Sequence, residues 1–395
     1  MLPQELLDLV VDNVPSSDRA TLRACSRAFR GIAARARTRL LRSMQLTPIT
    51  SEATAHTKGP KLLKLLESER EIGSLVQALH IVEGRDPTLP WIAKASRTLG
   101  LILPHLVNLR HFSLLGIRLG WSTLLRSFRS AINDVAPRLE TLYLRGLELA
   151  NPTDGREVCA LFTKARNLLR LGIVLSTGSQ FLPITPFCPS PPWTLQVIAF
   201  AEHWRANSTF KTLLSSANIT MLHTLSLYET DWARVATLLQ DLPAKNVVEQ
   251  LNIWVYGSFS ATPLGLARLN CLRSLRICSA FSYEISDLVT ECSTVPSLER
   301  LTMASSYLHS FPLNAPIVRP MLWQAFWTAV KARPSTLRFV ELYLSSQFQD
   351  QASARQKADV FRDLSHQAGV EDLVVRGDIS YVDIVNFEDA YPLSL

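Results

Sequence analysis

One short pattern recurs along most of this 395-residue chain and restricts the folds that it can adopt. The segment 139–144, LETLYL, has apolar residues at its first, fourth and sixth positions, as a short β-strand with one buried face would. The same six-residue frame occurs eleven times. It starts at Val76, Leu109, Leu139, Leu168, Leu195, Leu222, Val248, Leu272, Leu298, Phe339 and Val370. Because 47% of the chain is hydrophobic, the argument rests on the spacing of the frames and not on any one match.

That spacing is nearly constant over the middle of the chain. From Leu109 to Leu298 successive frames start 30, 29, 27, 27, 26, 24 and 26 residues apart, and the next interval, to Phe339, is 41 residues. The fourth position is Leu in nine of the eleven frames. A fixed period of this size is typical of a solenoid, and the frame resembles the leucine-rich repeat.

The strand frame also dictates what must surround it. Side chains at positions four and six point to the same face, and so short a strand cannot bury that face unless neighbouring strands stack beside it. Parallel strands need a long crossover, and the intervals contain helix-like patterns at 123–136, 155–165, 232–242 and 282–295. We therefore predict an α/β fold over residues 61–395: a curved solenoid of about eleven irregular repeats, with an inner parallel sheet and outer helices. An ordinary α/β sheet is the alternative, although its period would be longer and less even.

The composition argues against zinc-binding, disulfide-rich, secreted and membrane-spanning classes of protein. The net charge of +7 is only mildly basic, and the six cysteines form no CxxC pair, which argues against a zinc site or a disulfide framework and favours a reducing compartment. The N-terminal apolar run has no basic leader, so no signal peptide is expected. The longest charge-free stretch, 171–201, contains five prolines and cannot form a spanning helix. We expect a cytoplasmic or nuclear protein that does not bind membranes.

Motifs for chemistry are missing from the sequence. It has no glycine-rich phosphate loop, no HExxH and no GxSxG, and its eight histidines are scattered. We predict no catalytic residue, no cofactor and no metal site, and therefore a binding protein and not an enzyme.

The first 45 residues do not follow the repeat. Pro3 and Pro15 bracket a helical stripe, and a second stripe follows, which predicts a small bundle of short helices. The stripes are Leu2, Leu6, Leu9, Val10 and Val14, then Leu22, Cys25, Phe29, Ile32, Ala36 and Leu40. Residues 46–60 are polar, with two prolines and a glycine, and predict a linker. Residues 61–73 look helical and lead into a first, atypical repeat.

Residues 1–45 also resemble a known family, the F-box. The resemblance is carried by Leu2-Pro3-Gln4-Glu5-Leu6, Val10 or Val11, Asp18, Leu22, Cys25 and Phe29-Arg30. The chain departs from the family at Arg19, where Leu is frequent, and at Phe29, where Trp is frequent. The resemblance implies binding to the Skp-type adaptor of a cullin–RING ubiquitin ligase, and through the adaptor to the cullin. The implied adaptor contacts are Leu2, Pro3, Leu6, Val10, Val14 and Leu22. An F-box followed by leucine-rich repeats is typical of fungal F-box proteins.

Two other interpretations of this segment stay open. A solenoid needs its first apolar face covered, and the helices could serve only as that cap. Eight arginines also fall between residues 19 and 42 with no acidic residue after Asp18, a pattern that some nucleic-acid-binding helices share. The arginines share their helices with the apolar stripe, and no nucleic-acid motif accompanies them, so we expect no nucleic-acid partner.

The predicted target-binding surface comes from the strand frame. Positions three, five and seven should point away from the core, and several frames place there the Tyr, Trp and Arg side chains that anchor interfaces. The candidates are Tyr143, Arg145, Tyr228, Asn252, Trp254, Arg276, Arg300 and Tyr343. The predicted function is substrate receptor of an SCF-type ubiquitin ligase, which holds an unknown target protein near the ligase. The alternative is a leucine-rich-repeat scaffold with a helical cap and no role in ubiquitin transfer.

Overall fold

The structure is a computed structural model of the chain. It describes residues 4–14, 18–28, 30–47, 58–83, 91–175, 193–201, 218–229, 232–258, 262–280, 285–305, 320–344, 351–370, 372 and 374–376. The chain divides between Trp193 and Thr194 into two compact units, which we describe separately.

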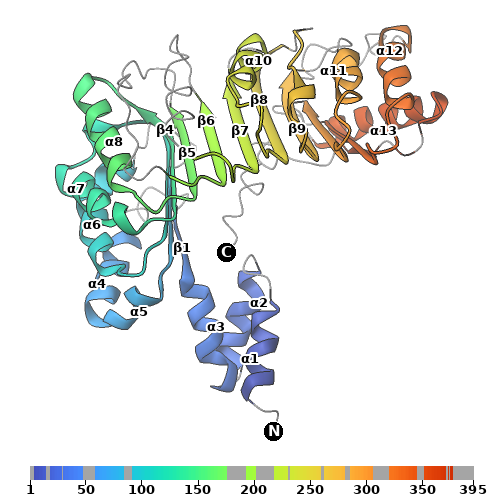
Figure 1. The fold of residues 1–395 in the computed structure, drawn as a ribbon. Coiled ribbons are helices and arrows are strands. Elements are labelled where there is room, and N and C mark those ends of the chain that lie inside the picture. Colours follow the sequence, from blue (N-terminus) through green and yellow to red (C-terminus); the bar gives the residue numbers. More distant parts are fainter. Residues whose placement is uncertain are drawn as a thin grey trace. The chain divides into compact units, whose positions relative to one another are not determined.

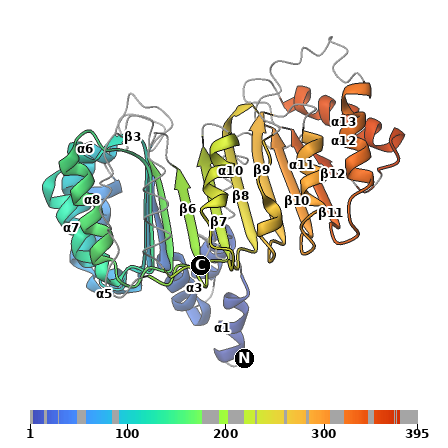
Figure 2. The same cartoon turned by 45° about the horizontal axis from the view of Figure 1, so that its top comes forward.

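The first unit begins with three helices and continues as alternating strands and helices (Figure 1). Its elements are α1 (Gln4–Asp12), α2 (Arg19–Ala28), α3 (Arg30–Arg42), β1 (Ser43–Leu46), α4 (Lys58–Ser68), α5 (Arg70–Leu75), β2 (Ala78–Val82), α6 (Trp91–Ile102), β3 (His111–Gly120), α7 (Arg126–Val135), β4 (Thr141–Glu148), α8 (Pro152–Lys164) and β5 (Arg170–Leu175). Three short 3-10 helices also occur, at Leu103–His105, Trp121–Thr123 and Ala136–Arg138. Figure 2 shows α6, α7 and α8 as a layer beside the strands of this unit.

The second unit repeats the same alternation. Its elements are β6 (Val197–Ala201), β7 (Thr224–Glu229), α10 (Trp232–Gln240), β8 (Gln250–Ser258), β9 (Ser274–Ala280), α11 (Ile285–Cys292), β10 (Arg300–Ser305), α12 (Pro320–Lys331), β11 (Phe339–Leu344), α13 (Gln351–Gln367) and β12 (Val374–Arg376), with a 3-10 helix at Leu266–Arg268.

All strand pairs within each unit are parallel and follow chain order, β1 to β5 in the first unit and β6 to β12 in the second. A doubly wound α/β sheet reverses its strand order at a switch point, so this in-order stacking excludes that alternative. Each of the eleven predicted frames lies at one of the strands β2–β12. The prediction of a leucine-rich-repeat-type α/β solenoid is therefore confirmed.

A repeated backbone hydrogen-bond pattern holds the strands in register. The carbonyl at frame position two accepts the N–H groups of positions two and three of the next strand. Gln77 O, for example, accepts from Arg110 N at 2.8 Å and from His111 N at 2.9 Å. The same pair of bonds recurs at the carbonyls of Arg110, Glu140, Gln196, His223, Glu249, Arg273 and Glu299. Because each strand starts from the same pair of bonds, side chains at equal frame positions lie in rows across the sheet.

The core lies between the strands and the helices. In the nine frames that start from Val76 to Leu298, the side chains at positions one, four and six are at most 1% exposed. This burial confirms the predicted inward positions. Positions three, five and seven lie on the opposite side of the strands, which we call the open face.

The frame predicted at Phe339 is wrong by two residues. In β11, Leu301 pairs with Val340 and Met303 pairs with Leu342, so the structural frame starts at Leu337. Leu337 is 1% exposed whereas Phe339 is 50% exposed. A shift of two residues keeps the alternation within the strand, so Leu342 is buried in both registers and the apolar pattern alone fits both. Phe339 is the residue that changes, from the core position one to the outward position three.

The predicted boundaries near the N-terminus also need correction. Residues 43–46 form β1, an additional strand that pairs in parallel with β2 from Ser43–Ala78 to Leu46–Ile81. The sequence placed these residues at the end of the bundle and in the linker. Helix α4 begins at Lys58, inside the predicted linker, and the single helix predicted over 61–73 is two helices that meet at Glu69. Residues 48–57 lie outside the described residues.

Candidate protein-binding surfaces

The three N-terminal helices form a small bundle with its own core. Val11, Leu22 and Ala36 are at most 1% exposed, and four partly buried apolar side chains pack against them: Val14, Cys25, Ile32 and Leu40. The second predicted stripe therefore lies in the bundle core, as an amphipathic pattern requires. The first stripe is wrong for most of its described residues: Val14 packs against the core, but Val11 enters it in place of Leu6, Leu9 and Val10. Phe29 lies outside the described residues.

A second apolar surface on α1 is left open. Leu6, Leu9 and Val10 are 47%, 56% and 58% exposed. The three residues are three and four positions apart or adjacent, so they lie together on one side of a nine-residue helix. We call them the α1 patch. Isolated exposed leucines are common, but three together on one short helix form a surface suited to a partner.

The structure separates the predicted adaptor contacts into two groups. Leu6 and Val10 belong to the α1 patch and are accessible. Val14 packs against the bundle core and Leu22 is 1% exposed, so their prediction as direct contacts is corrected: both are interior residues of the bundle. Leu2 and Pro3 lie outside the described residues. Leu9 was part of the predicted stripe but was not among the predicted contacts.

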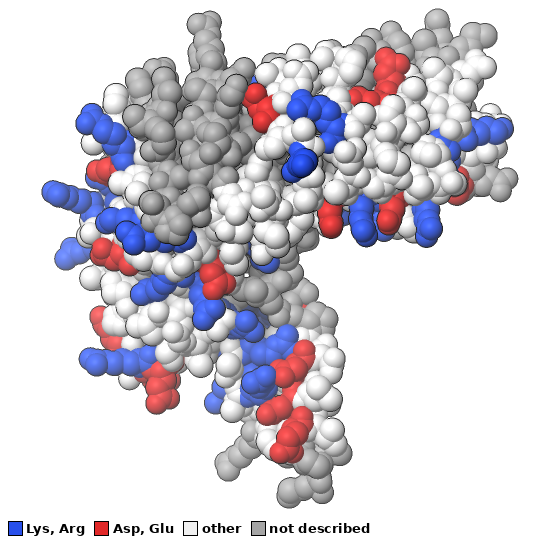
Figure 3. Space-filling model, in the orientation of Figure 1, with Lys and Arg blue, Asp and Glu red and all other residues white. Residues whose placement is uncertain are grey.

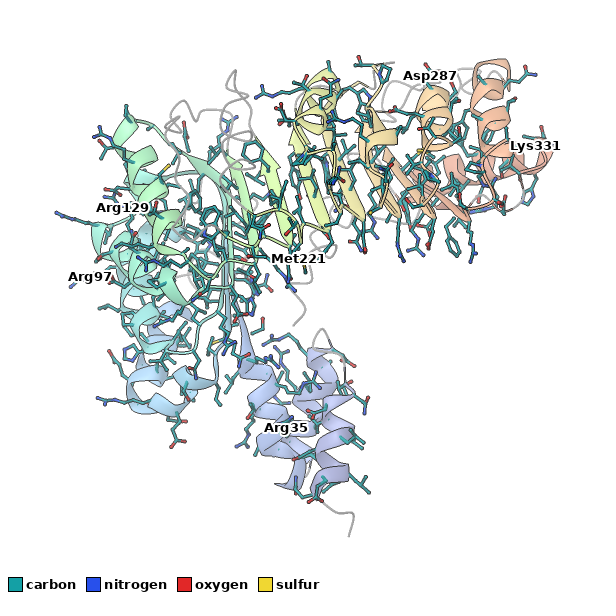
Figure 4. All side chains as sticks on the ribbon, viewed as in Figure 1. Arg35, Arg97, Arg129, Met221, Asp287 and Lys331 are labelled. Carbon is teal, nitrogen blue, oxygen red and sulfur yellow. The ribbon has the colours of Figure 1, made fainter. Side chains whose placement is uncertain are left out.

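Some of the clustered arginines form hydrogen bonds between the helices of the bundle. Arg35, labelled in Figure 4, donates from Nε and Nη2 to the two carboxylate oxygens of Asp12 at 2.9 and 2.8 Å. This pairing with the Arg35 guanidinium lowers the pKa of Asp12. Arg39 donates to the carbonyl of Val11. These contacts join α3 to α1, so part of the basic run has a structural role.

The bundle is tied directly to the first strand. Arg19 donates to Leu40 O at 3.2 Å and to Ser43 O at 3.0 Å, and burial lowers the pKa of its guanidinium. Arg42 Nε donates to Gln77 Oε1 at 2.7 Å, and Gln77 N donates to Arg42 O at 2.8 Å. Helix α3 therefore enters β1 without a spacer. Arg19, the residue that departs from the F-box pattern, supplies two of the bonds at this junction.

The open face of the first unit is largely closed by its own side chains. The Tyr143 ring covers Gly172 on the next strand: a Cβ added to Gly172 would lie 1.6 Å from Tyr143 Cδ2. Tyr143 is consequently 4% exposed, so the prediction that it is accessible is wrong, while Arg145 is partly exposed.

A buried histidine, His80, and a partly buried one, His111, lie on the same open face. His80 Nδ1 is 3.1 Å from Ser113 Oγ, and His111 Nδ1 is 2.9 Å from Thr141 Oγ1. Burial lowers the pKa of each histidine to about 4. Both imidazoles are therefore neutral at neutral pH.

On the open face of the second unit, the predicted anchors Tyr228 and Trp254 pack against each other. Their ring centroids are 5.6 Å apart with an interplanar angle of 12°, and the residues are 5% and 9% exposed. The prediction that they are accessible is also wrong. Because Tyr228 and Trp254 are register partners on β7 and β8, each ring covers the other.

Three more of the predicted residues lie on the same open face, on β8, β9 and β11. Asn252 donates to Ser226 Oγ at 3.0 Å, and Arg276 and Tyr343 are partly exposed. Burial lowers the pKa of Arg276. On the neighbouring strands, Thr302 donates to Glu341 Oε2 at 3.2 Å. These bonds hold polar side chains in fixed positions across β7–β11.

Arg300 and Phe339 form an accessible pair on this open face. They are register partners on β10 and β11, and the Arg300 Cζ lies 5.1 Å from the centroid of the Phe339 ring. Arg300 is exposed and Phe339 is 50% exposed. Phe339 was missed as a surface residue because the sequence frame placed it at a core position.

Side chains that could bind a metal ion are dispersed over the part of the chain that the structure describes. Among the described residues no three His, Cys, Asp or Glu side chains are grouped to hold a metal ion. Burial raises the pKa of the Cys159 thiol to about 11, which disfavours its reactive form. A search of the described helices finds none with the length and apolar character to cross a membrane.

Comparisons with known proteins add little. No protein-family description and no curated protein matches this sequence. Among solved structures, an internalin C2 from Listeria monocytogenes str. 4b F2365 matches at 15% identity and a TM-score of 0.22, covering 56% of this chain and 80% of that one. A likeness this weak carries no argument, and the fold assignment rests on strand order, register and burial.

Proposed function

We propose that this protein is a two-sided protein-binding receptor, with the N-terminal helices holding an adaptor and the solenoid holding a target. In the more specific form of the proposal, the adaptor is the Skp-type subunit of a cullin–RING ubiquitin ligase. The observation that carries it is the α1 patch, whose three apolar side chains are about half exposed although the bundle already has a core of its own.

An exposed apolar helix face is suited to binding a protein partner. Burying such side chains against a partner stabilises a complex by roughly 25 cal/mol per Å² of apolar surface. The patch lies within the segment that resembles an F-box, at Leu6 and Val10, where that resemblance implies adaptor contacts. Arg19 bonds to Ser43 of β1 and Arg42 bonds to Gln77 just before β2, so an adaptor bound to the bundle would be held close to the start of the repeats.

The second candidate is a scaffold in which the bundle only caps the solenoid. The observation that favours it is the direct entry of α3 into β1, since a cap also lies against the first strand. The two candidates differ in what they require of the α1 patch. A cap needs only the interior residues of the bundle, whereas an adaptor needs Leu6, Leu9 and Val10.

The test is a binding measurement with purified Skp-type adaptor. Leu6→Asp places a charge in the proposed contact, and an unpaired charge buried at an interface costs several kcal/mol, so capture of the adaptor should fall more than about a hundredfold. The matched control is Leu101→Asp on α6, because Leu101 is 52% exposed and lies outside the bundle. It should bind as wild type does.

Circular dichroism checks that both variants are folded. Equal adaptor capture by wild type and folded Leu6→Asp contradicts the adaptor proposal. No capture by wild type leaves the cap as the better interpretation.

A further inference from the structure

Accessible aromatic and basic side chains on the open face of the second unit are brought together by the structure at β9–β11. Arg300 lies over the Phe339 ring, with Arg276 on the preceding strand. Thr302 pairs with Arg276 and bonds to Glu341. We call Arg276, Arg300, Thr302, Phe339 and Glu341 the β9–β11 surface. Tyr228 and Trp254 lie outside it.

The Arg300–Phe339 pair has the properties of a binding anchor. A guanidinium over an aromatic face gains a cation–π interaction, and its in-plane N–H groups remain directed to the side. Beyond its contact with the Phe339 ring, the Arg300 guanidinium forms no hydrogen bond or ion pair with another described residue, and the residue is exposed. A half-exposed Phe is unfavourable in water, so its retention beside an oriented arginine favours a partner that covers both.

The charged side chains at β9–β11 indicate the charge of the partner. At frame positions two, three and five of β9–β11 the chain has four arginines and two glutamates: Arg273, Arg276, Arg300 and Arg338, and Glu299 and Glu341. Figure 3 shows acidic and basic side chains next to each other along the lower edge of this unit. The excess of positive charge favours an acidic ligand. Glu341, fixed beside the arginines by Thr302, opposes a dianionic phosphate more than a singly charged carboxylate.

Resting on the proposed role as a receptor, we propose that the β9–β11 surface binds an acidic, extended segment of the target protein. Carboxylates at alternate positions of that segment would be held by Arg300 and Arg276, and a neighbouring apolar side chain would cover Phe339. The spacing agrees with this assignment. Diagonal neighbours on adjacent strands are roughly 7–8 Å apart, and alternate residues of an extended peptide are about 7 Å apart.

The probe is a short fluorescein-labelled peptide that alternates Glu with Ser and ends in Leu, measured by anisotropy at low salt against the full chain. Wild type should bind it, and the counterpart with Gln in place of Glu should not bind. Arg300→Gln should weaken binding about tenfold, because a charge-assisted hydrogen-bond pair is lost. Phe339→Ala should weaken it by a smaller factor.

The matched control is Arg338→Gln, which removes the same charge from the adjacent exposed arginine and should change affinity less than about twofold. Equal losses in Arg300→Gln and Arg338→Gln would mean non-specific attraction and overturn the proposal, as would equal binding of the Gln peptide or no binding at all. If single-stranded RNA displaces the peptide, and the RNA itself binds in an Arg300-dependent way, the proposal of an acidic protein segment is overturned and the β9–β11 surface is a nucleic-acid-binding surface.

The adaptor measurement separates this proposal from the proposed function. Arg300→Gln should capture the Skp-type adaptor as wild type does. If the adaptor binds and the acidic peptide does not, only the β9–β11 assignment fails. If the peptide binds in an Arg300-dependent way and the adaptor does not, only the ligase role fails.

Discussion

The fit of the Tyr143 ring over Gly172 gives the sharpest stability prediction. Gly172→Ala would place the new Cβ 1.6, 2.2 and 2.9 Å from Cδ2, Cε2 and Cγ of the Tyr143 ring. Carbon atoms cannot approach so closely, so the ring must leave a site in which Tyr143 is only 4% exposed. Overpacking of this kind costs about 1–3 kcal/mol, and we expect Gly172→Ala to lower the free energy of unfolding by that amount.

Removing the Tyr143 ring should reverse the effect of Gly172→Ala on the free energy of unfolding. In the Tyr143→Ala background the added methyl group has room, and Gly172 is not one of the glycines with positive φ, which are Gly146, Gly265 and Gly369. Gly172→Ala should then be neutral or stabilising by about 0.4–1 kcal/mol, because alanine restricts the unfolded chain. The coupling in this double-mutant cycle is therefore about 1–3 kcal/mol or somewhat more.

The assay is urea unfolding followed by far-UV circular dichroism and tryptophan fluorescence, with all four proteins of the cycle compared. Gly59→Ala is the control, since a Cβ there meets only the Thr98 side chain at 3.4 Å. It should not destabilise the protein. If Gly172→Ala costs the same in both backgrounds, the close contact with the ring is not the cause and the argument fails.

Two further predictions follow from the same contacts. His80 and His111 have pKa values lowered to about 4 in the fold against 6.5 when unfolded. The stability that depends on their neutral form is therefore fully present above pH 6.5 and is lost as pH falls toward 4. Each adds a slope approaching about 1.4 kcal/mol per pH unit, and urea titrations of wild type and His80→Asn should differ in that window; parallel curves would contradict the assignment. Arg19→Leu, which restores the residue frequent in the F-box, should lower bundle stability by about 1–3 kcal/mol through loss of the bonds to Leu40 O and Ser43 O. Hydrogen exchange of α3 and β1 measures this loss, with exposed Arg23→Leu as the control; unchanged protection in Arg19→Leu would remove the junction role.

The sequence alone determined the repeat and the face that each strand buries. The apolar residues at positions one, four and six are a local, periodic signal, and the side chains of nine frames are buried as the pattern requires. The second N-terminal stripe was readable for the same reason, since helical spacing places Leu22 and Ala36 on a buried side. The buried face of α1 was not, because apolar residues occur all round this short helix and packing against α2 and α3 selects Val11 over Val10.

Tertiary structure decided which of the outward side chains are accessible. Alternation along a strand assigns Tyr143, Tyr228 and Trp254 to the open face, but it does not tell what neighbouring strands place beside them. Gly172 leaves space for the Tyr143 ring, and Trp254 lies against Tyr228. Those contacts join residues about 26 to 29 positions apart, which no local pattern specifies.

Register at β11 and the strand β1 were likewise decided by pairing. Leu337 and Phe339 are both apolar and differ by two positions, so either could begin the frame, and only the bonds to β10 place Phe339 on the surface beside Arg300. The segment Ser43–Leu46 is too short to show a period, and it becomes a strand because β2 supplies its backbone partners. Parallel pairing is a long-range interaction, and the sequence encodes it only through the neighbour that each strand meets.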